Sequence, residues 1–188
     1  ELRGALDNDE FELYFQPKVD LETGAMVAAE ALIRWRHPER GLVSPARFIP
    51  VAEQSRLIGP IGDWALREAC RLLAEWQADG LGSVRIAVNV SLVQFQVGDF
   101  AATVADAIEA YGIDPGALTL EITESVFERE SDRLFTQIGA IHDLGVRLSL
   151  DDFGTGYSSL LYLHRYPFDE IKIDQGFVRG MRDDDYSH

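Results

Sequence analysis

Hydrophobic residues along this chain follow two periodicities, one typical of strands and one typical of helices. Residues 11–17 and 26–33 are predicted to be strands joined by a turn, and residues 63–78 repeat apolar positions every three or four residues, which predicts a helix. The other predicted strands cover 84–90, 118–123, 146–150 and 170–174. The other predicted helices cover 100–111, 134–141 and 158–164. Alternating strands and helices with short connections predict an α/β fold, in which helices cover a mostly parallel sheet.

The composition suits one globular domain. The chain has 188 residues, of which 46% are hydrophobic, enough for a substantial core. Cys70 is the only cysteine, and no apolar run approaches the roughly 20 residues that cross a bilayer. We therefore expect a cytoplasmic protein, although a longer chain could tether it to a membrane. The acidic residues 182–188 are expected to be a loop or tail.

The charge balance narrows the range of partners. The formal net charge is −15, from 17 basic and 32 acidic residues, which argues against binding a nucleic acid polymer through a basic surface. Most of the acids are expected to be solvated. A minority could hold metal ions, and these ions would let an acidic protein bind an anionic substrate.

One segment, RLSLDDFGTGYSS over residues 147–159, places two adjacent carboxylates at the end of a hydrophobic strand. Like charges repel in a poorly hydrated place and resist ionisation. Asp151 and Asp152 are tolerable there if a metal ion, a lysine or an arginine lies between them.

Polar residues share one face of the predicted strands. Because side chains alternate along a strand, Thr119 and Glu121 oppose aliphatic neighbours, and Ser149 and Asp151 do the same one strand later. In a β/α barrel, the C-terminal strand ends carry the active site. The polar groups predicted at this rim are Glu30, Asn89, Glu121, Asp151, Asp152 and Lys172.

These groups are oxygen donors and one amine, which favours a hard cation such as Mg²⁺ or Mn²⁺. Asp151 could bridge two cations, and a two-metal site can clamp both oxygens of a phosphoryl displacement. The residues alone also allow an enolase-like enzyme, in which carboxylates hold Mg²⁺ and Lys172 acts as a base next to a carbonyl.

The motifs resemble those of EAL domains, bacterial phosphodiesterases that cleave cyclic di-GMP. The resemblance covers essentially the whole chain. The matching motifs, in order, are YFQPK at 14–18, EALIRW at 30–35, FIPVAE at 48–53, NVS at 89–91, EITE at 121–124, DDFGTGYSS at 151–159 and KID at 172–174.

The resemblance implies a modified TIM barrel with an antiparallel first strand, which hydrolyses cyclic di-GMP to linear 5′-pGpG with Mg²⁺ or Mn²⁺. It implies that one metal binds Glu30, Asn89, Glu121 and Asp151, and that Asp151 and Asp152 help to bind a second. It also implies that Lys172 positions and helps to activate the attacking water. The catalytic set is therefore Lys172, Glu30, Asp151 and Asp152.

Other matching positions are expected to bind substrate or to support the site. The expected substrate contacts are Gln16, Leu32 and Arg34, with Glu53 and Asp174 on the guanine side. Glu124 matches a glutamate that steadies the loop 153–159, and this loop tends to lie near a dimer interface in the family, so a homodimer is expected.

The match also implies that residues 1–188 form an EAL domain that is incomplete at its C-terminus. Six strands are predicted where a barrel of this kind has eight, and the last two β-α units, one of which supplies another glutamate ligand, are absent from the sequence. We therefore expect part of a longer multidomain protein with an N-terminal sensor or GGDEF-type domain. The alternative is a catalytically inactive module that binds cyclic di-GMP and signals to a partner.

Overall fold

The computed structural model describes residues 1–81, 84–124, 126, 131–154, 163 and 165–176. The strands are β1 (Phe11–Val19), β2 (Met26–His37), β3 (Gly41–Val43), β4 (Arg85–Val90), β5 (Leu118–Thr123), β6 (Arg147–Phe153) and β7 (Glu170–Ile173). The helices are α1 (Leu2–Asp7), α2 (Pro45–Gln54), α3 (Ile58–Ala78), α4 (Leu92–Gln96), α5 (Phe100–Tyr111), η1 (Pro115–Ala117) and α6 (Asp132–Asp143).

The strands form one sheet in the order β1-β2-β4-β5-β6-β7, with the short β3 paired to β2 alone. β1 runs antiparallel to β2, and the pairs from β2 to β7 along this order are parallel. The predicted α/β fold with an antiparallel first strand is confirmed. The prediction of six strands missed β3, a three-residue arm. In the described part of the chain, β1 and β7 are the two ends of the order, so the sheet is not closed there.

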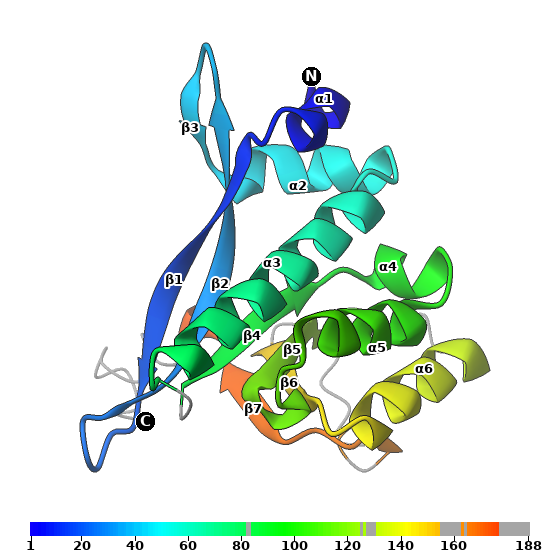
Figure 1. Ribbon diagram of the computed structural model, residues 1–188. Coiled ribbons are helices and arrows are strands. Elements are labelled where there is room, and N and C mark those ends of the chain that lie inside the picture. Colours follow the sequence, from blue (N-terminus) through cyan, green and yellow to red (C-terminus); the bar gives the residue numbers. More distant parts are fainter. Residues whose placement is uncertain (82–83, 125, 127–130, 155–162, 164, 177–188) are drawn as a thin grey trace, which may run out of the picture.

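Helices α3, α5 and α6 cover one face of the sheet (Figure 1). The side chains between the layers are the aliphatic positions of the strand alternation, such as Leu120 and Leu148, which are fully buried. Ile138 of α6 packs in the same core. This outer face supplies most of the apolar burial that stabilises the domain, so the polar side chains of the same strands are directed to the other face.

A second, aromatic cluster lies where α1 and α2 meet the β1–β2 hairpin (Figure 1). The ring of Phe11 lies 6.2 Å from that of Trp35 and 5.8 Å from that of Phe48. The indole N–H of Trp35 donates a hydrogen bond of 2.8 Å to Glu10. This cluster fixes α2 beside β2 and thereby places Glu53, near the end of α2.

Capping residues define several helix ends. Asp99 accepts a hydrogen bond from the N–H of Ala102 at the start of α5, and Gly112 ends that helix in the left-handed conformation. Ser91 and Gln94 form a capping box at α4. The predicted helix 63–78 begins five residues earlier than expected, at Ile58, because Gly59 and Pro60 are tolerated in its first turn.

Two expectations concern segments outside the described residues: the helix at 158–164, apart from residue 163, and the acidic tail at 182–188. Among the described helices, none combines the length and the apolar character that a membrane crossing requires.

Candidate active site

The strand register places the predicted rim residues on one face of the sheet. Glu30 of β2 lies beside Ala87 of β4, and Asn89, two residues further, lies beside Glu121 of β5. The side-chain amide of Asn89 donates a hydrogen bond of 2.9 Å to Glu30. Neighbouring strands therefore bring these polar groups together.

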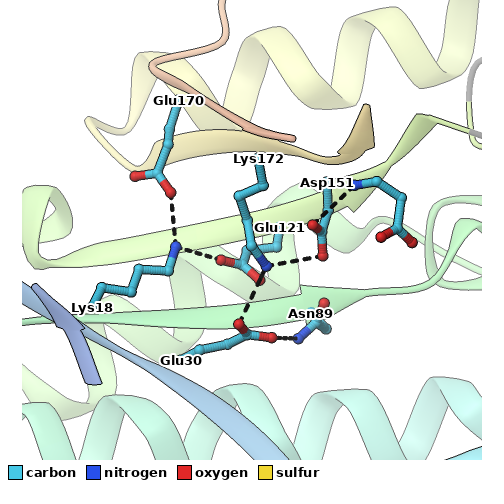
Figure 2. Close-up of polar contacts among 8 residues, drawn as sticks. Lys18, Glu30, Asn89, Glu121, Asp151, Glu170 and Lys172 are labelled. Atoms are coloured by element: carbon cyan, nitrogen blue, oxygen red, sulfur yellow. Dashed lines mark hydrogen bonds and ion pairs between the residues drawn. The ribbon is translucent and has the colours of Figure 1, made fainter. Parts of the chain in front are cut away.

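Lys172 of β7 lies at the centre of the carboxylates (Figure 2). Its ammonium group donates to Glu121 at 2.6 Å and to Asp151 at 3.0 Å. A third hydrogen bond, of 3.2 Å, reaches Glu30. Three carboxylates from three different strands thus point at a single cation, and the side chain of Lys172 is only 24% exposed.

A second lysine, which the sequence reasoning missed, extends this cluster (Figure 2). Lys18 of β1 donates a hydrogen bond of 2.7 Å to the Oε1 atom of Glu121 and another of 2.7 Å to Glu170 of β7. The alternation along β1 could have identified Lys18 as a site residue, because Lys18 lies on the same face of the strand as Gln16, which was assigned to the site. We call Lys18, Glu30, Glu121, Asp151, Glu170 and Lys172 the charged cluster.

A β-bulge explains the adjacent carboxylates. Leu150 pairs with Ile171 and Phe153 pairs with Ile173, so Asp151 and Asp152 together oppose Lys172 alone. Asp152 has a positive φ of 55°, and its N–H donates to the side chain of Asp151 at 2.9 Å. A regular strand would send neighbouring side chains to opposite faces. The bulge breaks this alternation at the site.

Burial and neighbouring charges shift the pKa values of the charged cluster in opposite directions. Burial would lower the pKa of Lys172, but hydrogen bonds and charge from Glu121, Asp151 and Glu30 raise it above its ordinary value. Lys172 is therefore an ammonium at neutral pH. Burial would likewise raise the pKa of Glu30, but Asn89 and Lys172 bring it below the ordinary value.

The pKa values of two other carboxyl groups shift upward. Burial raises the pKa of Glu121, whose side chain is fully buried, although both lysines oppose the shift. Burial also raises the pKa of Asp152, and repulsion from Asp151 and Asp174 adds to it. Ionisation of these two groups is therefore less favourable than in water unless further positive charge lies nearby.

The donor set fits a hard cation. Carboxylate oxygens of Glu30, Glu121 and Asp151 converge within 3.2 Å of one ammonium nitrogen, which is the arrangement of ligand types that Mg²⁺ or Mn²⁺ takes. The buried hydroxyl of Ser149, beside Glu121 in the register, has no hydrogen-bond partner among the described residues. The described residues contain no group of three or more His, Cys, Asp or Glu already spaced around a metal.

The predicted substrate contacts on β1 and β2 lie beside the charged cluster. Gln16 is exposed and lies directly opposite Glu30 in the register. Arg34 donates to the carbonyl of Ile33 at 2.9 Å, and its guanidinium lies 5.5 Å from the centre of the Tyr14 ring. Leu32 pairs with Tyr14 between these two positions.

A cavity of about 330 Å³ adjoins the site between β2, β4 and the helices α2, α3 and α4. Most of its lining is apolar, and its polar lining includes Glu53, Asn89 and Ser91. The carboxylate of Glu53 accepts a hydrogen bond of 2.7 Å from the hydroxyl of Ser91. Leu32 and Glu53 therefore share this cavity with Asn89, and Glu53 is held there by Ser91.

The last two predicted residues, Asp174 and Glu124, follow β7 and β5. Asp174 follows β7, accepts a hydrogen bond from the N–H of Gly176 at 2.8 Å, and acts electrostatically on Asp152. Glu124 is buried and accepts a hydrogen bond of 3.0 Å from the N–H of Gly154. This contact ties the start of the loop 153–159 to the end of β5, whereas residues 155–159 lie outside the described part.

Comparisons with known proteins identify the family of this chain. The family model described as the EAL domain matches residues 1–188. The bifunctional diguanylate cyclase/cyclic di-GMP phosphodiesterase MucR of Pseudomonas aeruginosa is 44% identical over 98% of this chain. A cyclic di-GMP phosphodiesterase of the same organism is 43% identical over 91% of the chain. The chain spans 27% and 29% of the lengths of these two relatives.

A solved structure, described as the PaMucR phosphodiesterase in complex with c-di-GMP, superposes with a TM-score of 0.91 at 44% identity. The match covers 97% of this chain and 74% of that one. The family match over the whole sequence, together with these identities, shows that the chain belongs to the EAL domain family.

Proposed function

We propose that this domain hydrolyses cyclic di-GMP to linear 5′-pGpG with the help of Mg²⁺ or Mn²⁺. The observation that carries the proposal is the convergence of Glu30, Glu121 and Asp151 on the ammonium of Lys172. The relatives named as cyclic di-GMP phosphodiesterases support the choice of substrate. They give no support to the enolase-like alternative.

Four residues would hold the first cation: Glu30, Asn89, Glu121 and Asp151. Asp152, the other residue of the bulge, would join Asp151 in holding a second. When bound, such cations lower the pKa of water and neutralise charge on the phosphate. The hydrolysis adds the water oxygen to phosphorus and releases the ribose 3′ oxygen, which leaves a 5′ phosphate on the linear product.

Lys172 would act as a hydrogen-bond donor. Hydrogen bonds and charge from its carboxylate neighbours raise its pKa, which favours the ammonium form. An ammonium among the carboxylates can orient the attacking water and stabilise negative charge that develops during the attack. In this role, Lys172 would position the attacking water and help to activate it.

The flanking residues would bind the rest of the dinucleotide. Arg34 carries a fork of donors suited to a phosphate, and Gln16 lies opposite Glu30 at the edge of the charged cluster. A guanine base presents adjacent N–H groups that suit a carboxylate such as Glu53, beside Leu32 in the cavity. Asp174, which follows β7, would also act on the guanine side of the site.

We further propose a homodimer within a longer protein that carries an N-terminal sensor or GGDEF-type domain. The chain spans about a quarter of its curated relatives, and one of these is named as bifunctional. The proposed place of action is the cytoplasm.

The test uses the full-length protein with cyclic di-GMP and Mn²⁺, and follows pGpG by chromatography. We expect product formation that stops when the divalent cation is chelated. Binding of cyclic di-GMP without product would indicate a receptor module and not an enzyme. Absence of both binding and product would contradict the proposal altogether.

A further inference from the structure

Lys18 and Lys172 are the only lysines in the sequence, and every other basic side chain except histidine is arginine. Both lysines contact the same carboxylate, that of Glu121. An ammonium is a compact charge, whereas guanidinium is a broad planar fork. In a chain that otherwise uses arginine, lysine therefore occurs only where a small cation lies between converging carboxylates.

The two lysines hold Glu121 at both of its oxygens. Lys18 binds Oε1 at 2.7 Å and Lys172 binds Oε2 at 2.6 Å, one from each end of the strand order. The side chain of Glu121 is 0% exposed, so water does not provide replacement donors readily. Its orientation is fixed by these two contacts.

Lys18 is itself held in place. Its ammonium donates to Glu170, the first residue of β7, at 2.7 Å, and its side chain is 22% exposed. Glu170 lies beside Ser149 of β6 in the register. The contact joins β1 to β7, the two ends of the sheet, across the face that carries the charged cluster (Figure 2).

We infer that Lys18 is a positioning residue that orients Glu121 for cation binding, an inference that rests on the proposed function. Without Lys18, Oε1 of Glu121 would be a buried acceptor that has lost its donor. The side chain would then rotate to recover a hydrogen bond, because an unpaired buried carboxylate oxygen is costly. Glu121 would no longer present Oε2 in the orientation that the other carboxylates share.

The test is calorimetric titration of Mn²⁺, without substrate, into the full-length protein and its Lys18→Met variant. We expect the Kd for Mn²⁺ to rise on the order of 10-fold, as for loss of a hydrogen-bond partner of a ligating carboxylate. The kcat for cyclic di-GMP should fall while KM changes little, because Lys18 acts through Glu121. Lys18→Arg should recover only part of the Mn²⁺ affinity.

A matched control removes another cation from the same strand pair. Arg36 forms an exposed ion pair with Glu12 of β1, so Arg36→Met should leave the Kd unchanged. A double variant separates positioning from general stability: in a Glu121→Gln background, adding Lys18→Met should weaken Mn²⁺ binding no further. Lys18→Gln is measured in the same way if Lys18→Met does not fold.

The outcomes are distinct. Wild-type binding of Mn²⁺ with an unchanged Kd in the Lys18 variants would overturn this inference alone. An additional loss of Mn²⁺ affinity in the Glu121→Gln background would show a role that does not pass through Glu121, and would also overturn it. A wild-type protein that neither binds Mn²⁺ nor hydrolyses cyclic di-GMP would overturn the proposed function, and this inference with it.

Discussion

The two faces of the sheet bury different kinds of side chain, apolar on one face and charged on the other. On the outer face, Leu120 and Leu148 are fully buried beneath helices. On the inner face, Glu121 is equally buried, but among lysines and other carboxylates. Successive residues of one strand, Leu120 and Glu121, thus belong to a hydrophobic core and to a charged cluster.

The difference separates stability from chemistry. Apolar burial on the outer face stabilises the domain without directional contacts. Buried carboxylates on the inner face contribute little net stability, because removing charges from water costs about as much as their pairing returns. We therefore expect substitutions on the two faces to affect different measurements.

The largest expected effect is on turnover, through Glu30. Glu30→Ala removes a proposed cation ligand and a partner of Lys172. The rate of cyclic di-GMP hydrolysis should fall by more than about 100-fold. Losing a hydrogen-bond partner of a metal ligand costs up to about 100-fold, and losing the ligand itself should cost more. The thermal unfolding midpoint should change little.

A matched acidic control lies on the helical layer. Glu68→Ala removes one carboxylate from an ion pair with Arg71 on α3, and its turnover should equal that of the wild type. If Glu30→Ala kept wild-type turnover, the assignment of this site would be wrong.

The next effect is on stability, through the outer face. Leu120→Ala opens a cavity in the core and should lower the free energy of unfolding by about 3 kcal/mol in chemical denaturation. Leu42→Ala makes the same change at a position that is 50% exposed, and should cost within about 0.5 kcal/mol. Equal costs at the two positions would contradict the account of the core.

The smallest effect concerns pH and Asp152. Burial, with repulsion from Asp151 and Asp174, raises the pKa of Asp152 in the folded state. Its ionisation therefore destabilises the fold above that raised pKa, and the penalty disappears below the unfolded value of about 4. Asp152→Asn keeps a residue type that accepts positive φ, and should raise the unfolding midpoint at pH 7 in the absence of divalent cations.

The advantage of Asp152→Asn over the wild type should shrink as the pH falls from 7 to 4. Asp143→Asn, at an exposed position near the end of α6, is the control for removing a carboxylate outside the site. An advantage that grew toward pH 4 would have the wrong sign for a raised pKa.

The sequence predicted regular alternation better than its exceptions. Strand β5 and helix α5 have the predicted bounds, because their apolar spacing is unbroken and Gly112 ends the helix. Helix α2 was missed although Ser44 and Pro45 signal its start, because Pro50 interrupts the pattern. The sequence predicts this helix only if the start signals at Ser44 and Pro45 are given more weight than the proline inside it.

Residue positions at the rim could be predicted where they depend on alternation, whereas contacts that depend on strand pairing and curvature could not. Asn89 and Glu121 follow from strand parity, whereas parity is less clear at Glu30 because Ala29 and Ala31 are small too. The bulge at Asp151 and Asp152 needs the pairing with β7, which the sequence does not display. The contact from Lys18 to Glu170 joins the two ends of the strand order, and only the curved sheet brings them together.

The most direct test of the central claim is the anomalous scattering of Mn²⁺ in crystals of the protein with cyclic di-GMP. The account predicts a peak bound by the carboxylates of Glu30, Glu121 and Asp151 together with Asn89, next to a substrate phosphate. A peak bound elsewhere, or no peak with the substrate in place, would contradict it.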